Sequence, residues 1–140
     1  MIRAVADASF CGAWILQDET SERAEGLLLE VETGGVELVV PALWHYEMQN
    51  LLKMAHRRDR LDRIAVDAAR AALANIPFKE VDVPDVEARA KLLEIAFEYD
   101  LTAYDAAYLE LAKRLSAPLY SNDRALIRAA ELLGVELPIQ

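Results

Sequence analysis

The sequence predicts an α/β fold in which a central, mainly parallel sheet is covered by helices on both faces. Short apolar segments suited to buried strands alternate along the chain with longer segments of helical spacing. Such alternation is typical of parallel sheets, whose crossover helices cover both faces. The 140 residues contain no internal repeat and no low-complexity linker, so we expect a single domain spanning residues 1–140.

In the first half of the chain we expect two strands, at residues 2–6 and 37–40, and four helices, at residues 8–16, 22–33, 41–58 and 62–75. The first strand ends at Asp7, and Asp7 or Ser9 stands near the start of the helix that follows. Gly34 and Gly35 stop the second helix, because glycine commonly ends helices. Pro41 opens the third helix, where its missing N–H does no harm.

In the second half of the chain we expect strands at residues 78–83, 118–121 and 135–137, and helices at residues 85–99, 102–112 and 124–133. Pro77 and Pro84 bound the first of these strands. Thr102 is a good N-cap for the helix that carries Asp105. Gly134 ends the last helix.

Composition and charge exclude several classes of protein. The single cysteine, Cys11, permits no intrachain disulfide, which suits the reducing cytoplasm that we expect as the location. No apolar run is long enough for a signal peptide or a membrane span. The net charge of −9 argues against a broad electropositive surface for nucleic acid. The basic run at residues 56–60, with Arg63, is either a solvated helix end or a local contact for phosphates or acidic groups.

Asp105 has two interpretations. Three residues after Thr102, it completes a capping-box-like pattern and complements the helix dipole. At about 100° per residue, however, it shares a face with Leu101, Tyr108 and Leu109, and this face should point into the protein. A buried carboxylate needs a partner.

Glu47 lies inside the helix predicted at residues 41–58, so no helix end explains it. It falls among Leu43, Trp44, Leu51 and Met54, in the middle of an apolar stripe. Helices usually place glutamate on the opposite, solvated face. Glu47 is therefore either a rim residue that reaches solvent or an arginine, or a member of a shared acidic site.

Asp7 and Asp123 both follow predicted strands, at the carboxyl edge where open parallel sheets form their sites. Each could simply cap a helix. Together with Glu47 and Asp105 they could instead converge on one site, because carboxylate oxygens suit Mg²⁺ or Mn²⁺. One such ion can activate water and orient a phosphodiester. Ser9 and Ser121, two residues from Asp7 and Asp123, could support the carboxylates or cap helices.

The sequence resembles the PIN-domain family of ribonucleases, and most of all the VapC-type toxins of toxin–antitoxin modules. The similar segments are residues 5–9, 41–52, 101–112 and 119–126, and the most specific is Leu-Thr-x-Tyr-Asp-Ala-x-Tyr at residues 101–108. One departure is Ala8, where many relatives carry threonine.

The resemblance implies a three-layer α/β/α fold and a metal-dependent endoribonuclease that cleaves RNA phosphodiester bonds. It implies that Asp7, Glu47 and Asp105 are the principal metal-binding acids, that Asp123 is the fourth acid, and that Ser121 is the accompanying hydroxyl residue. It also implies a type II toxin with a cognate antitoxin as inhibitor, and commonly a homodimer. We expect no membrane association.

Two non-enzymatic alternatives compete with this interpretation. A receiver-like signalling domain would need paired acids after the first strand and a lysine after a late strand, and the chain offers a single Asp7 and no lysine after Asp123. A degenerate PIN module that only binds a partner is disfavoured by the intact four acids.

Overall fold

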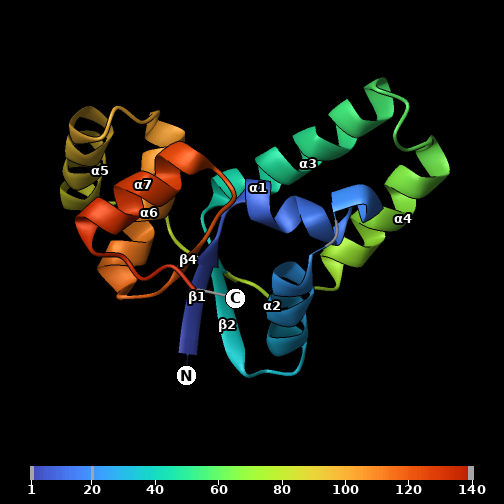
Figure 1. The fold of residues 1–140 in the computed structure, drawn as a ribbon, viewed down its shortest axis with the longest axis horizontal. Coiled ribbons are helices and arrows are strands. Elements are labelled where there is room, and N and C mark those ends of the chain that lie inside the picture. Colours follow the sequence, from blue (N-terminus) through green and yellow to red (C-terminus); the bar gives the residue numbers. More distant parts are fainter. Residues whose placement is uncertain (1, 20, 139–140) are drawn as a thin grey trace.

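The computed structural model describes residues 2–19 and 21–138, which form a four-stranded parallel sheet with helices on both faces (Figure 1). The strands are β1 Ile2–Ala6, β2 Val36–Val40, β3 Lys79–Glu80 and β4 Leu119–Tyr120. Their order across the sheet is β3-β2-β1-β4, and each neighbouring pair is parallel. The predicted three-layer α/β/α arrangement is confirmed.

The helices divide between the two faces of the sheet. They are α1 Ala8–Cys11, α2 Glu22–Glu32, α3 Ala42–Arg57, α4 Arg63–Ala74, α5 Val86–Glu98, α6 Ala103–Leu115 and α7 Arg124–Leu133. Helix α6 packs against β1 with α5 and α7 beside it, and α2 packs against β2 on the other side (Figure 1). Helices α3 and α4 pack on each other as a hairpin that extends away from the sheet (Figure 1).

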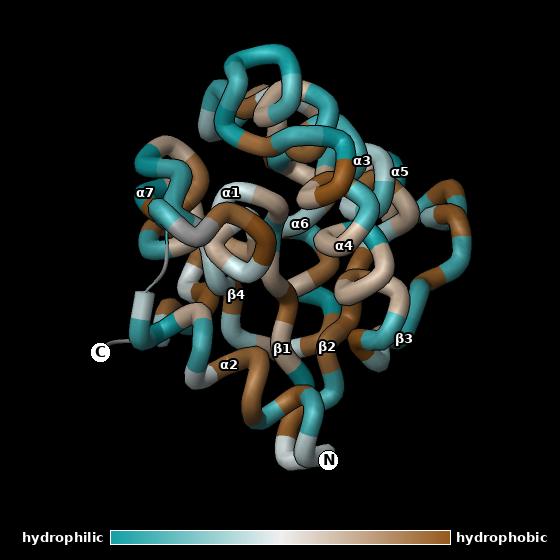
Figure 2. Tube along the Cα trace, turned by 90° about the vertical axis from the view of Figure 1, so that its right-hand side faces the viewer, coloured by the Kyte–Doolittle hydropathy of each residue, from teal (hydrophilic) through white to brown (hydrophobic). Residues whose placement is uncertain are grey.

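The core lies between the sheet and these helices. Strands β1 and β2 contribute Val5 and residues 38–40, which are almost completely buried. Trp44 and Met48 of α3 and Leu109 of α6 pack into the same cluster. Figure 2 shows apolar colouring along much of β1 and β2, between the helices. In the described part of the chain, no helix is long and apolar enough to cross a membrane.

The helix predicted at residues 8–16 is shorter than expected. It consists of the four-residue α1 and a 3₁₀ turn, Gly12–Trp14, and a second 3₁₀ turn follows at Gln17–Glu19. The tightening begins at Gly12, whose carbonyl accepts hydrogen bonds from the N–H groups of Ile15 and Leu16. A Cβ atom at Gly12 would lie 3.3 Å from Leu51 Cδ1, so glycine also permits the close approach of α3.

Two predicted strands also differ from the structure. The segment predicted at residues 78–83 pairs with β2 only through Lys79–Glu80. The strand predicted at residues 135–137 does not form. There the Leu119 N–H donates to the Glu136 carbonyl at 2.9 Å, but no ladder develops, and Pro138 has no N–H to extend one.

Candidate metal-binding site at the carboxyl edge of the sheet

Asp7 follows β1 directly and caps α1. Its extended backbone, with φ −90° and ψ 173°, turns the carboxylate back to accept the Phe10 N–H at 3.0 Å. Ser9 Oγ donates to Asp7 Oδ1 at 2.7 Å, and Ser121 Oγ donates to Oδ2 at 2.6 Å. Only 4% of Asp7 is exposed, so three donors hold a buried carboxylate in one orientation.

The loop after β4 is joined to the loop after β1 by hydrogen bonds. Ser9 Oγ accepts the backbone N–H of Asn122 at 3.0 Å, and the Asn122 side-chain amide donates to the Ser9 carbonyl at 3.2 Å. Ser121 Oγ accepts the Asp123 N–H at 3.0 Å, and Asp123 caps α7 through the Leu126 N–H at 3.0 Å. Both serines therefore connect the two loops.

Asn122, between Ser121 and Asp123, links the loop after β4 to the loop after β1. As a turn residue it would need only local hydrogen bonds, whereas here both its backbone and its side chain contact Ser9, 113 residues away. The one available signal was its place between Ser121 and Asp123, and that place gave no direction for its side chain.

Glu47 lies half-buried in the middle of α3. Its Oε1 accepts the Tyr108 hydroxyl of α6 at 2.5 Å, a contact between residues 61 positions apart. Neither a solvent-exposed rim position nor a pairing with arginine describes this environment. The sequence placed Tyr108 on the same helix face as Asp105, but it did not identify Tyr108 as the partner of Glu47.

Asp105 lies in the first turn of α6 and is half-buried. The N-cap is Thr102, whose hydroxyl accepts the Asp105 N–H at 3.1 Å. The helix is thus capped by the Thr102 side chain as predicted, while the Asp105 carboxylate lies on the face between the exposed and the buried sides of α6. Its position is compatible with both interpretations from the sequence.

Electrostatics connect the four acids. Burial raises the pKa of Asp7, the hydrogen bonds it accepts oppose that rise, and the negative charge of Asp105 adds to it. Burial also raises the pKa of Glu47, the Tyr108 hydroxyl opposes this, and Asp7 and Asp105 both add to it. The pKa of Asp105 is raised by burial and by Asp123. The repulsion thus extends from Glu47 through Asp7 and Asp105 to Asp123.

Among the described residues, no lysine, arginine or histidine side chain lowers the raised pKa values of Asp7, Glu47 and Asp105. Hard oxygen donors with excess negative charge and no neutralising lysine or arginine fit a divalent cation such as Mg²⁺ or Mn²⁺ in chemistry and charge. The geometry is not closed around one point: within residues 2–19 and 21–138, no three His, Cys, Asp or Glu side chains are grouped so that they could hold a metal ion. Hydrogen-bond donors occupy Asp7 and one oxygen of Glu47 instead.

The predicted basic run lies at the turn between α3 and α4. Arg60 reaches back to Asp18, with 2.7 Å between the guanidinium nitrogen and a carboxylate oxygen, so this arginine serves to anchor the hairpin. Arg57, Arg58 and Arg63 are exposed at the same turn. They form a local cationic surface in a chain of net charge −9.

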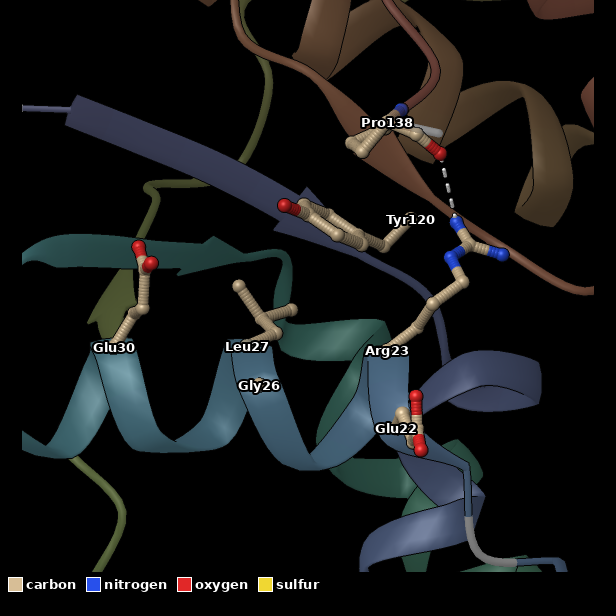
Figure 3. A pocket seen from close by; sticks show the side chains of 7 residues that line it. All are labelled: Glu22, Arg23, Gly26, Leu27, Glu30, Tyr120 and Pro138. Atoms are coloured by element: carbon tan, nitrogen blue, oxygen red, sulfur yellow. Dashed lines mark hydrogen bonds between the residues drawn. The ribbon is translucent and has the colours of Figure 1, made fainter. Parts of the chain in front are cut away.

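A separate cavity of about 400 Å³ lies between α2, β4 and the C-terminal segment (Figure 3). Tyr120 lies over Leu27 in this cavity, and Arg23 donates to the Pro138 carbonyl at 3.2 Å (Figure 3). None of the four acids lines it. The cavity is therefore distinct from the acidic edge of the sheet.

The sequence of this chain is similar to those of known proteins. The sequence matches the PIN domain over residues 4–132. It is 31% identical over 128 residues to Ribonuclease VapC3 of Pyrobaculum aerophilum, covering 89% of this chain and 92% of that protein.

Two crystal structures share the fold. PAE2754 from Pyrobaculum aerophilum is similar with a TM-score of 0.67 at 26% identity, over 91% of this chain and 86% of that one. VapC20 of Mycobacterium tuberculosis, a sarcin–ricin loop cleaving toxin, is similar with a TM-score of 0.57 over 90% and 94% of the two chains. At 17% identity, this second likeness concerns the fold alone. The family match across most of the sequence, together with the ribonuclease relative, shows that the chain belongs to the PIN-domain family.

Proposed function

We propose that this protein is a divalent-metal-dependent endoribonuclease, a hydrolase of RNA phosphodiester bonds, and the toxin of a type II toxin–antitoxin pair. The observation that carries the proposal is the series of repulsions that links Glu47 to Asp7 and Asp105, Asp7 to Asp105, and Asp105 to Asp123. These acids lie near the carboxyl edge of a parallel sheet, and no cationic side chain of the described residues offsets the raised pKa values of Asp7, Glu47 and Asp105. Membership in the PIN-domain family and the VapC ribonuclease relative support the same reaction class.

In this proposal Asp7, Glu47 and Asp105 would hold Mg²⁺ or Mn²⁺, and Asp123 would complete the acidic pocket. Ser9 and Ser121 would fix the Asp7 carboxylate through the hydrogen bonds that they already donate. When bound, a divalent cation supplies a more acidic water and offsets the charge of the phosphodiester. The half-buried setting would strengthen these interactions relative to water.

RNA would be bound locally, because the net charge of −9 leaves no broad basic surface. Arg57, Arg58 and Arg63 at the α3–α4 turn are suited to contact phosphates outside the reacting centre. The proposal also includes a cognate antitoxin that inhibits the protein and a homodimeric assembly. The protein would be a single domain over residues 1–140 and would act in the cytoplasm.

The experiment is RNA cleavage by protein freed of any antitoxin. A panel of structured RNAs is incubated with Mg²⁺, with Mn²⁺ or with excess EDTA, and the products are mapped at nucleotide resolution. Asp105→Asn is compared with Asp67→Asn, which replaces an exposed aspartate of α4 and changes the net charge by the same amount. We expect cleavage only with metal, loss in Asp105→Asn, and normal cleavage by Asp67→Asn.

Cleavage that persists in EDTA and in Asp105→Asn would contradict the metal mechanism. A protein that binds Mn²⁺ but cleaves no RNA of a panel that includes ribosomal and transfer RNAs would favour the binding-only alternative. The gene beside this one provides a second test, because its product should form a stable complex that suppresses cleavage.

A further inference from the structure

The hydrogen bond between Tyr108 and Glu47 ties α6 to the middle of α3. The phenol donates to Glu47 Oε1 at 2.5 Å, and only 1% of Tyr108 is exposed. One turn earlier on the same helix, Tyr104 is 65% exposed. The two tyrosines therefore differ in burial and share their helix, their chemistry and their neighbourhood in sequence.

Without a restraint, the Glu47 side chain would favour a different conformation. Its side chain is long and flexible, it is only partly buried, and it is repelled by Asp7 and Asp105. An unrestrained glutamate in that position would turn towards solvent. Among the described residues, Tyr108 is the single donor to the Glu47 carboxylate, and it uses one of the two oxygens.

We propose that Tyr108 is a positioning residue, which holds Glu47 towards Asp7 and Asp105 and leaves Oε2 free as a single-oxygen ligand. The role rests on the proposed function, because it concerns Glu47 as a ligand of the divalent cation. It makes Tyr108 a determinant of metal affinity, although Tyr108 donates its hydroxyl proton to Glu47 and is not itself a ligand of the ion. Residues that orient a metal ligand in this way typically change affinity or activity about 10- to 100-fold when they are removed.

The competing explanation is that Tyr108 only fills the core and uses Glu47 to satisfy its own hydroxyl. Tyr108→Phe separates the two, because it keeps the ring and removes the donor. A core role would change thermal stability and leave Mn²⁺ affinity as it was. A positioning role would change Mn²⁺ affinity whether or not stability changes.

The test is Mn²⁺ binding to the full, metal-free chain, measured by electron paramagnetic resonance titration, with near-ultraviolet circular dichroism as the check on folding. Tyr108→Phe should weaken Mn²⁺ binding about 10- to 100-fold, whereas the matched control Tyr104→Phe should bind like the unmodified protein. In a Glu47→Gln background, Tyr108→Phe should weaken binding less than about twofold further, because contacting residues are not additive.

The outcomes separate this role from the function on which it rests. If the unmodified protein bound no Mn²⁺, the proposed metal dependence would fail and the positioning role would fail with it. If the unmodified protein bound Mn²⁺ and Tyr108→Phe bound it equally tightly, the positioning role alone would be overturned. Equal losses in the Glu47 and Glu47→Gln backgrounds would also overturn it.

A second measurement needs no variant at Tyr108. The buried hydroxyl proton, held against a carboxylate, should give a slowly exchanging low-field proton resonance in the metal-free protein. Added Mg²⁺ should shift this resonance and keep it, since Oε1 stays with Tyr108 while Oε2 takes the ion. Loss of the resonance on Mg²⁺ addition would contradict the single-oxygen arrangement even if Tyr108→Phe failed to fold.

Discussion

Within residues 2–19 and 21–138, four helices begin with an aspartate N-cap, and these caps divide into two pairs. Asp7 and Asp123 lie at the carboxyl edge of the sheet, and each accepts an N–H three residues on at 3.0 Å. Asp62 and Asp85 are exposed at the starts of α4 and α5, and they accept the equivalent N–H at 2.8 and 2.9 Å. The capping hydrogen bond, from the N–H three residues further along the chain, is the same in both pairs.

The difference lies in what surrounds the carboxylates. Asp7 is buried, has two serine hydroxyls as additional donors, and has a pKa raised by burial. Asp62 has its cap hydrogen bond and solvent. The cap motif is common to both pairs and therefore does not identify a site residue. What distinguishes Asp7 and Asp123 is that each follows a strand at the carboxyl edge of the sheet.

The largest expected effect concerns Asp7. Asp7→Asn should reduce RNA cleavage by more than about 100-fold, since loss of a ligand should exceed the effect of losing an outer partner. Asp62→Asn should leave cleavage unchanged. Single-turnover rates on one cleaved RNA provide the measurement, with circular dichroism to show that both variants fold. Equal rates in the two variants would mean that Asp7 is no more than a cap.

The next effect concerns the serine that donates to Asp7 Oδ2. Ser121→Ala should lower cleavage and Mn²⁺ affinity by about 10- to 100-fold, because it frees one oxygen of the carboxylate. The control is Ser21→Ala, which removes the N-cap of α2 and should cost about 1 kcal/mol of stability with normal cleavage. Normal Mn²⁺ affinity in Ser121→Ala would argue against the role of the serine.

A smaller effect is expected on the stability of the metal-free protein. The folded-state pKa values of Asp7, Glu47 and Asp105 lie above the ordinary values of 3.8 for aspartate and 4.5 for glutamate. At neutral pH these ionised groups therefore destabilise the folded state. As pH falls through the raised values towards 3.8 and 4.5, this penalty should disappear and the contribution of these groups to unfolding free energy should rise. Urea unfolding in EDTA at a series of pH values measures the trend.

Asp105→Asn tests whether repulsion between the acids destabilises the metal-free protein. Removal of one charge from the coupled set should raise the melting temperature of the metal-free protein at neutral pH by about 3 °C, equivalent to about 1 kcal/mol. The same change should reduce the stabilisation that Mn²⁺ adds. Asp67→Asn should do neither. If Asp105→Asn lowered the melting temperature and kept the full Mn²⁺ response, Asp105 would serve the helix start alone.

The smallest effect belongs to the surface caps. Asp62→Ala should cost about 0.5–1 kcal/mol in the unfolding free energy, the usual range for an exposed N-cap. Cleavage and Mn²⁺ affinity should stay at the level of the unmodified protein. A loss of cleavage in this variant would remove the distinction between the two pairs of caps.

Much of the fold was predictable because its signals are local. Alternating strands and helices, the N-cap at Thr102 and the helix stop at Gly134 depend on hydrogen bonds within a few residues. The errors occurred where another part of the chain intervenes. Gly12 tightens the first helix beside Leu51 of α3, and residues 135–137 meet β4 through the hydrogen bond from the Leu119 N–H to the Glu136 carbonyl without forming a ladder.

The sequence by itself determined the alternation of elements, the helix caps and the four acids that stand out of pattern, because burial periodicity and capping act over short distances. Only the tertiary structure decided which donors meet which acids. Ser121 reaches Asp7 across 114 residues, Asn122 reaches Ser9 across 113, and Tyr108 reaches Glu47 across 61. Such contacts depend on how the strands are ordered and how α6 packs on β1, and no local pattern encodes that order.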